Sequence, residues 1–213
     1  MEALSRINFL GCKIIDMGEK MSIKPSTDMR AQRSRRWLYE ALLQLMKEKP
    51  YREIQITEIA DRAQVARPTF YLHYHSKDEL LLSQVDVVFA EFLNELSNTI
   101  AEGNYDRLKY SVLIFQYWER NVEILKMVMQ AGLHEEFRER LRKYFLLAIT
   151  QLTTQSGKSK ADEQIREFIV DFESGGAYQI LIQWIARGMP YSAEQMGSLF
   201  YQLAAAGQNA RIA

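Results

Sequence analysis

Residues 54–74 carry side chains whose types and spacing suit contact with a nucleic acid. Arg67, Thr69, Tyr71 and His73 alternate along the second half of this segment. An arginine can donate two hydrogen bonds to O6 and N7 of guanine, and the hydroxyls of threonine and tyrosine suit phosphate oxygens. The segment therefore favours DNA recognition as its chemistry.

The apolar residues of the same segment predict the elements that position these groups. Their spacing predicts two short helices, about residues 56–63 and 67–74, joined by a turn at residues 64–66. Ala60 is small where the helices approach each other, and Pro68 falls in the first turn of the second helix, which tolerates its missing N–H. We expect a small core of five side chains: Ile59, Ala63, Val65, Phe70 and Tyr74. This arrangement is a helix-turn-helix, with the polar groups on the outer side of its second helix.

The distribution of charge agrees with a DNA-binding end. The whole chain has a net charge of zero, but residues 24–36 hold five basic residues against one acid. A basic segment on an otherwise acidic protein suits phosphate binding, although a solvated run of charge is the plainer alternative.

Helical periodicity recurs along the remaining chain, and strand signals are nearly absent. An apolar stripe from Trp37 to Met46 predicts a first helix that ends before Pro50, and a longer stripe predicts a helix from near Ser76 to about residue 103. Further helices are expected at about residues 105–120, 122–131, 133–156, 162–187 and 192–208. The fold class is therefore all-α. Residues 1–27 lack sustained periodicity, and we interpret them as a loosely attached, poorly ordered leader.

Residues 31 to about 82 resemble the DNA-binding domain of the tetracycline-repressor (TetR) family of transcription regulators. The residues that carry the resemblance are Ile59-Ala60, Ala63, Val65, Thr69-Phe70-Tyr71, His73-Tyr74 and Ser76-Lys77-Asp78-Glu79-Leu80. Residues 45–51 also resemble a subgroup that includes activators of dihydroxyacetone kinase genes. The resemblance covers about a quarter of the chain. It implies a three-helix helix-turn-helix domain followed by a helical regulatory and dimerisation domain.

The resemblance also implies roles for single residues. Tyr71 and Lys77 match positions that contact phosphates, and Ser76 is suited to cap the long helix beside Lys77. The positions that match residues facing the major groove are Arg67, Pro68, Thr69, Leu72 and His73. We add Gln55, Thr57 and Ala66 to the expected DNA-binding set.

Three residues depart from the family's pattern. Gln55 and Ala66 stand where the family usually has a hydroxyl residue that caps a helix, and Gln64 replaces the usual turn glycine. A side chain at Gln64 would occupy a position where φ is positive. Each departure costs about 1 kcal/mol of local order, and none removes a donor from the groove.

Aromatic and methionine residues beyond position 110 suggest a pocket for a small organic effector. Each of them is explained as well by an ordinary core position, and the pocket itself is what the family resemblance implies. The candidates are Phe115, Trp118, Met127, Met129, Phe137, Tyr144 and Phe172.

The last two expected helices suggest a dimer interface. Gly175 and Gly176 interrupt an apolar stripe, at a cost of about 1 kcal/mol each in an isolated helix. Close approach of another backbone would offset this cost, from a second copy or from a helix of the same chain. The expected interface consists of Phe172, Gly175, Gly176, Gln179, Ile180, Trp184, Leu199, Phe200 and Leu203.

Other classes of protein find little support in the sequence. The single cysteine, Cys12, excludes an internal disulfide, and no stretch approaches the ~18 apolar residues of a membrane span. The three histidines lack a companion ligand set, and no nucleophile motif or phosphate loop occurs, so we expect no metal, cofactor or enzymatic activity.

We therefore predict a cytoplasmic regulator, most simply a repressor, that binds a palindromic duplex as a homodimer under control of a small ligand. The expected domains are the leader at residues 1–27, the DNA-binding domain at 28–75 and the ligand-binding and dimerisation domain at 76–213. Two alternatives stay open: a co-regulator that acts through a partner protein without touching DNA, and an unrecognised helical enzyme.

Overall fold

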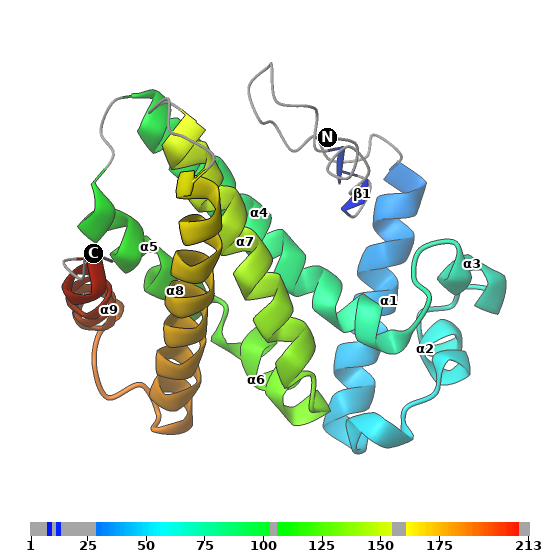
Figure 1. Ribbon diagram of the computed structural model, residues 1–213. Helices are drawn as coiled ribbons and strands as arrows, with labels where there is room; N and C mark the ends of the chain where they lie inside the picture. Colours follow the sequence, from blue (N-terminus) through cyan, green and yellow to red (C-terminus); the bar gives the residue numbers. More distant parts are fainter. Residues whose placement is uncertain (1–7, 10–11, 14–28, 103–105, 155–160, 209–213) are drawn as a thin grey trace. The chain divides into compact units, whose positions relative to one another are not determined.

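The structure, a computed structural model, describes residues 8–9, 12–13, 29–102, 106–154 and 161–208 (Figure 1). Near the start, β1 (Asn8–Phe9) and β2 (Cys12–Lys13) form a short antiparallel pair. Apart from these two strands, the predicted leader, residues 1–27, lies outside the residues that the structure describes.

The described chain is helical from residue 29 onward, which confirms the all-α fold class. Its first elements are α1 (Met29–Glu48), the 3-10 turn η1 (Tyr51–Glu53), α2 (Ile56–Arg62), α3 (Arg67–Tyr71) and α4 (Lys77–Ala101). The remaining helices are α5 (Arg107–Arg120), α6 (Val122–Ala131), α7 (His134–Thr154), α8 (Ala161–Ala186) and α9 (Ala193–Gln208). The expected ends of helices near residues 131 and 187 are confirmed: Gly132 and Gly188 take φ of 79° and 75° just beyond these helix ends, a conformation that glycine adopts readily.

The chain divides into two compact units. One, which we call the head, contains residues 1–87 and 127–133; the other, the body, contains residues 88–126 and 134–213. In the head, α1 packs on α2 and α2 packs on α3. The apolar stripe of α1 is buried at Leu38, Ala41, Leu42 and Leu45. Trp37, predicted to join this stripe, is instead 44% exposed, with the guanidinium of Arg33 over its ring.

In the body, α5 packs against α9 and α7 packs against α8. The first pair meets at Gly197 of α9: a Cβ there would lie 2.7 Å from the backbone nitrogen of Val112 and 2.9 Å from the carbonyl oxygen of Ser111. No side chain fits in that space, so glycine permits the two backbones to approach. Aliphatic side chains and several aromatic rings are buried in the same core, among them Phe89 stacked on Tyr144 with ring centroids 4.2 Å apart.

Within the described ranges, no helix combines the length and hydropathy that a membrane crossing requires.

Candidate nucleic-acid interface

Helices α2 and α3 form the predicted helix-turn-helix. The turn between them is closed by backbone hydrogen bonds from Gln64 N to Asp61 O, at 3.1 Å, and from Val65 N to Ala60 O, at 3.0 Å. Gln64 has φ of 54°, as its place in the turn predicts. A non-glycine residue in this region is strained. The hydrogen bonds and the packing around the turn therefore hold a conformation that glutamine itself disfavours.

The core that joins these helices agrees with the sequence in all but one residue. Ile59, Ala63, Phe70 and Tyr74 are buried, and Ala60 is buried where α2 approaches its neighbours. Val65 is half-buried. Helix α3 has only five residues, so its orientation depends on this small core.

The outer side of α3 carries the side chains predicted to bind DNA. Arg67, Pro68, Tyr71 and Leu72 are exposed, Leu72 to 80%, whereas Thr69 and His73 are half-buried. Of the added positions, Gln55 and Ala66 are exposed and Thr57 is half-buried.

Two of the exposed groups on α3 contact each other. The Arg67 guanidinium lies 5.6 Å from the centre of the Tyr71 ring and donates a hydrogen bond of 3.3 Å to the Tyr71 hydroxyl. These residues are four apart, and therefore lie on one face of the helix. The guanidinium is held at the exposed surface of α3, and only one of its five N–H donors is engaged by Tyr71.

The ends of the short helices are capped unequally. Glu58 of α2 accepts a hydrogen bond of 2.9 Å from the backbone N–H of Gln55, so the first turn of α2 is closed by Glu58 rather than by a hydroxyl residue at position 55. Ala66 offers no such group to α3. The prediction that Ser76 caps α4 is confirmed, because its hydroxyl accepts a hydrogen bond of 3.0 Å from the backbone N–H of Glu79.

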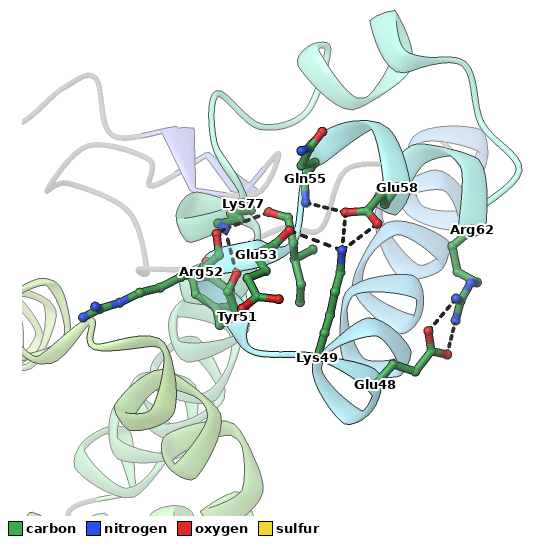
Figure 2. Close-up of polar contacts among 10 residues, drawn as sticks. Glu48, Lys49, Tyr51, Arg52, Glu53, Gln55, Glu58, Arg62 and Lys77 are labelled. Carbon is green, nitrogen blue, oxygen red and sulfur yellow. Dashed lines mark hydrogen bonds and ion pairs between the residues drawn. The ribbon is translucent and has the colours of Figure 1, made fainter.

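Lys77, the first residue of α4, directs its ammonium at backbone carbonyls of the head. Its Nζ donates to the oxygens of Tyr51, at 2.7 Å, and Ile54, at 2.8 Å, with the oxygen of Arg52 at 3.3 Å (Figure 2). Burial lowers the pKa of this ammonium from its ordinary value.

Two ion pairs join the end of α1 to α2, and the sequence did not point to either. Lys49 Nζ lies 2.6 and 2.7 Å from the two carboxylate oxygens of Glu58, and Arg62 donates two hydrogen bonds to Glu48 (Figure 2). The hydrogen bonds from Lys49 hold the pKa of Glu58 below its ordinary value, and those from Arg62 do the same for Glu48. These partners are nine and fourteen residues apart, so helical spacing gives no signal of them.

The body contains a narrow apolar cavity. It is lined by Val88, Phe89, Phe92, Tyr110, Ile114, Tyr117, Trp118, Tyr144 and Phe145. Its free space is about 10 Å³, which is about what one water molecule needs. At its edge, Tyr117 donates a hydrogen bond of 2.6 Å to Glu95, and burial raises the pKa of Tyr117 to about 12.

The predicted pocket residues are only partly brought to this cavity. Trp118 and Tyr144 line it. Phe115 and Phe137 are buried in the same unit, whereas Phe172 is 61% exposed. Met127 and Met129 belong to residues 127–133, which cluster with the head. The missed lining residues come chiefly from α4 and α5, whose apolar spacing resembles that of any buried helix.

The residues predicted for the dimer interface fall into two groups. Trp184 and Phe200 are buried within the chain, where both rings pack on Phe115. The others lie at the surface or half-buried: Phe172, Gly175, Gly176, Gln179, Ile180, Leu199 and Leu203. A Cβ built at Gly175 or Gly176 meets no other described atom within 4 Å. Among the described residues, nothing therefore crowds the Cβ position of these two half-buried glycines, in contrast to Gly197.

Metal ligands do not gather in the described part of the chain: no three His, Cys, Asp or Glu side chains lie close enough together to hold an ion.

Comparison with known proteins decides the family. The profile of the "Bacterial regulatory proteins, tetR family" matches residues 38–83, which include the helix-turn-helix, and a "Transcriptional regulator C-terminal region" of the same family matches residues 108–205. The chain belongs to the TetR family of transcriptional regulators.

Individual relatives are distant. The chain is 24% identical to the HTH-type transcriptional regulator YuxN of Bacillus subtilis over 157 residues, which are 74% of this chain and 48% of YuxN. It thus spans about half the length of that relative. It is 20% identical to the fatty acid metabolism regulator protein of B. subtilis over 181 residues, covering 80% of this chain and 93% of that protein.

Among solved structures, the dihydroxyacetone kinase operon activator DhaS is similar in fold. The two agree with a TM-score of 0.53 and 22% identity, over 82% of this chain and 95% of DhaS. At this identity the likeness concerns the fold alone.

Proposed function

We propose that this TetR-family chain regulates transcription by binding a palindromic DNA operator as a homodimer, most simply as a cytoplasmic repressor. DNA binding is assigned to residues 28–75, and ligand binding and dimerisation to residues 76–213. The observation that carries the proposal is the outer face of α3, where Arg67, Tyr71 and Leu72 are exposed on a short helix with a well-packed inner face.

The chemistry of this face suits the major groove. Arg67, exposed beside the Tyr71 ring, can donate two hydrogen bonds to a guanine edge, and the Tyr71 hydroxyl can bind a phosphate. Leu72 is 80% exposed and offers an apolar contact of the kind that the methyl group of thymine accepts. Without a bound partner, the large apolar side chain of Leu72 stays exposed to water, which is unfavourable.

Exposed apolar residues of the body support the dimer. Phe168 and Phe172 of α8 are 75% and 61% exposed, and Leu199 and Leu203 of α9 are also exposed. A group of large apolar side chains at the surface is typical of an interface, and a two-fold dimer pairs such a surface with itself. No described atom lies within 4 Å of a Cβ built at Gly176, which leaves room at this point for a helix of the partner.

Replacing Gly176 with leucine tests the dimer. No described atom crowds a Cβ at this position, so the variant should fold with unchanged helix content but sediment as a monomer at micromolar concentration. Its affinity for a palindrome should fall steeply, because two heads no longer bind as one unit. A variant that still sediments as a dimer would place the interface elsewhere.

A small apolar ligand is the proposed effector. The cavity between α4, α5 and α7 of the body is lined by aromatic and aliphatic side chains, but its free space suits one water molecule. Ligand pockets usually measure about 300–1,000 Å³, so binding would have to spread these helices. A ligand that weakens DNA binding must, by linkage, bind the DNA-bound form less tightly by the same factor.

Salt-dependent binding to duplex DNA tests the function itself. Wild-type protein should bind a random-sequence duplex with an affinity that falls as salt increases, because neutralised phosphates release counterions. Absence of such binding, together with capture of a protein partner, would support the alternative of a co-regulator that does not touch DNA.

A further inference from the structure

Lys77 stands at a position where a positive charge is unfavourable for its own helix. It is the first residue of α4, and the N-terminus of a helix carries a partial positive charge. The next two residues, Asp78 and Glu79, are acidic and suit this place. The cost of Lys77 must be offset by something outside α4.

Four consecutive carbonyls supply that offset. The backbone oxygens of residues 51–54 each accept a hydrogen bond from a lysine ammonium, and we call these four oxygens the carbonyl cluster. Lys77 reaches those of Tyr51, Arg52 and Ile54, and Lys49 reaches that of Glu53 at 3.2 Å (Figure 2). The C-terminal end of a helical turn carries partial negative charge, which attracts an ammonium.

The ammonium of Lys77 has no donor left over in this arrangement. A lysine has three N–H donors, and three carbonyl oxygens lie at 2.7, 2.8 and 3.3 Å from Nζ. The charge also lies 4.6 Å from the centre of the Tyr51 ring, which is buried. Tyr51 in turn donates a hydrogen bond of 2.6 Å from its hydroxyl to Asp78. Two consecutive residues of α4 are thus fixed to one residue of η1.

Moving Lys77 to a DNA phosphate would break these contacts. The oxygens of Tyr51 and Ile54 would lose a charged partner in a part-buried place, and such a loss is costly. We propose that Lys77 is a positioning residue and does not bind phosphate. It fixes the start of α4 to the carbonyl cluster, and thereby holds in place the DNA-binding face that α2 and α3 present. The proposal rests on the proposed function, since a DNA-binding face is what it positions.

The variant Lys77→Met keeps the unbranched chain and removes the charge. Lys47→Met is the matched control, because Lys47 is an exposed lysine of the same unit. Both are compared with wild type for binding to a random-sequence duplex of 30 base pairs, at 20 °C and between 50 and 200 mM salt, and for thermal unfolding.

For Lys77→Met we expect a melting temperature about 4 °C lower and an affinity about ten-fold weaker while the protein is folded, with an unchanged slope of log K against log salt. A phosphate contact would instead lower the slope by about 0.9. A slope reduced by about that amount, an affinity equal to that of wild type, or a melting temperature no lower than that of Lys47→Met would each overturn the proposal.

A measurement on the wild-type protein covers the case in which Lys77→Met does not fold. The NMR signal of the Lys77 ammonium should be protected from exchange with water in the free protein and should keep its chemical shift when the duplex is added. A signal that appears or moves when DNA is added would overturn the proposal. If wild-type protein binds no duplex at any salt, the proposed function fails, and melting and the ammonium signal still decide the role of Lys77.

Discussion

Gly197 in the body and Gln64 in the head both occupy positions that favour glycine, but only the first of them is a glycine. At Gly197, α9 approaches the backbone of α5 so closely that no side chain fits, and the residue present is the one that has none. At Gln64 the turn needs φ of 54°, and the residue present carries a side chain that disfavours it. At Gly197 the residue type suits the local geometry. At Gln64 it does not, and the surrounding contacts hold the turn in a strained conformation.

The difference follows from the size of the elements. In the body, α5 and α9 are 14 and 16 residues long and bury many apolar side chains against each other. In the head, α2 and α3 have 7 and 5 residues, and polar ties from Lys49, Arg62 and Lys77 supplement a small core. Regions with few buried contacts open most easily. A head of this kind suits an element whose orientation responds to DNA.

The largest effect is expected from filling the space at Gly197. Gly197→Ala should lower the free energy of unfolding by about 2 kcal/mol or more, because the added methyl group meets backbone that cannot turn aside. Unfolding by guanidinium measures the loss. The neighbouring variant Ser198→Ala should change stability by less than about 0.5 kcal/mol. Equal stability of the two variants would show that α5 and α9 are not closely packed at this point.

A smaller effect of opposite sign is expected in the head. Gln64→Gly should raise the free energy of unfolding by about 1 kcal/mol, because glycine adopts φ of 54° without strain. Gln64→Ala is the control, since it shortens the side chain and keeps the Cβ atom, and it should bring no gain. If Gln64→Gly destabilises the protein, the turn is not strained by its side chain.

The smallest effect expected is a response to acid that differs in sign between the two units. Salt bridges hold the folded pKa values of Glu48 and Glu58 below the ordinary 4.5, so their contribution to stability is full above pH 4.5 and is lost as pH falls further. Burial raises the folded pKa of Glu173 in the body above 4.5, in spite of its ion pair with Arg107. Its ionised form is therefore penalised at neutral pH, and the penalty disappears as pH falls toward 4.5.

Hydrogen exchange measured along the chain, and corrected for the intrinsic effect of pH, separates the two responses. Between pH 7 and 4.5 protection should increase in the body, and below 4.5 it should decrease in the head. Glu173→Gln should abolish the first change and keep the second. A body that loses protection over the first interval would contradict the account of Glu173.

Much of the fold could be predicted because long amphipathic helices repeat a simple spacing. The breaks at Gly132 and Gly188, the cap at Ser76 and the positive φ at Gln64 follow from local residue types, and all are present. The ties made by Lys49 and Lys77 could not be predicted, because each joins segments that become neighbours only after folding. Trp37 was misplaced because α1 buries a narrower stripe than its apolar residues suggest.

The same limit applies to the three glycines of α8 and α9 considered above. Gly175 and Gly176 are conspicuous in the sequence because they interrupt an apolar stripe, but no described atom lies within 4 Å of a Cβ built at either. Gly197 gave no such signal, since the demand for glycine comes from Val112, 85 residues earlier. Sequence spacing identifies a glycine that interrupts the apolar pattern of its own helix. It does not identify a glycine that is required because another helix packs closely against it.

Selection of bound sequences from a random duplex pool, by wild-type protein and by Arg67→Ala in parallel, tests the central claim that α3 recognises DNA bases. We expect wild-type protein to enrich a palindrome. We also expect Arg67→Ala to weaken binding to this palindrome by about 1–3 kcal/mol and to lose the preference at one base pair in each half-site. Identical sequence preferences for the two proteins would remove Arg67 from base recognition, and failure of wild-type protein to enrich any sequence would contradict the claim itself.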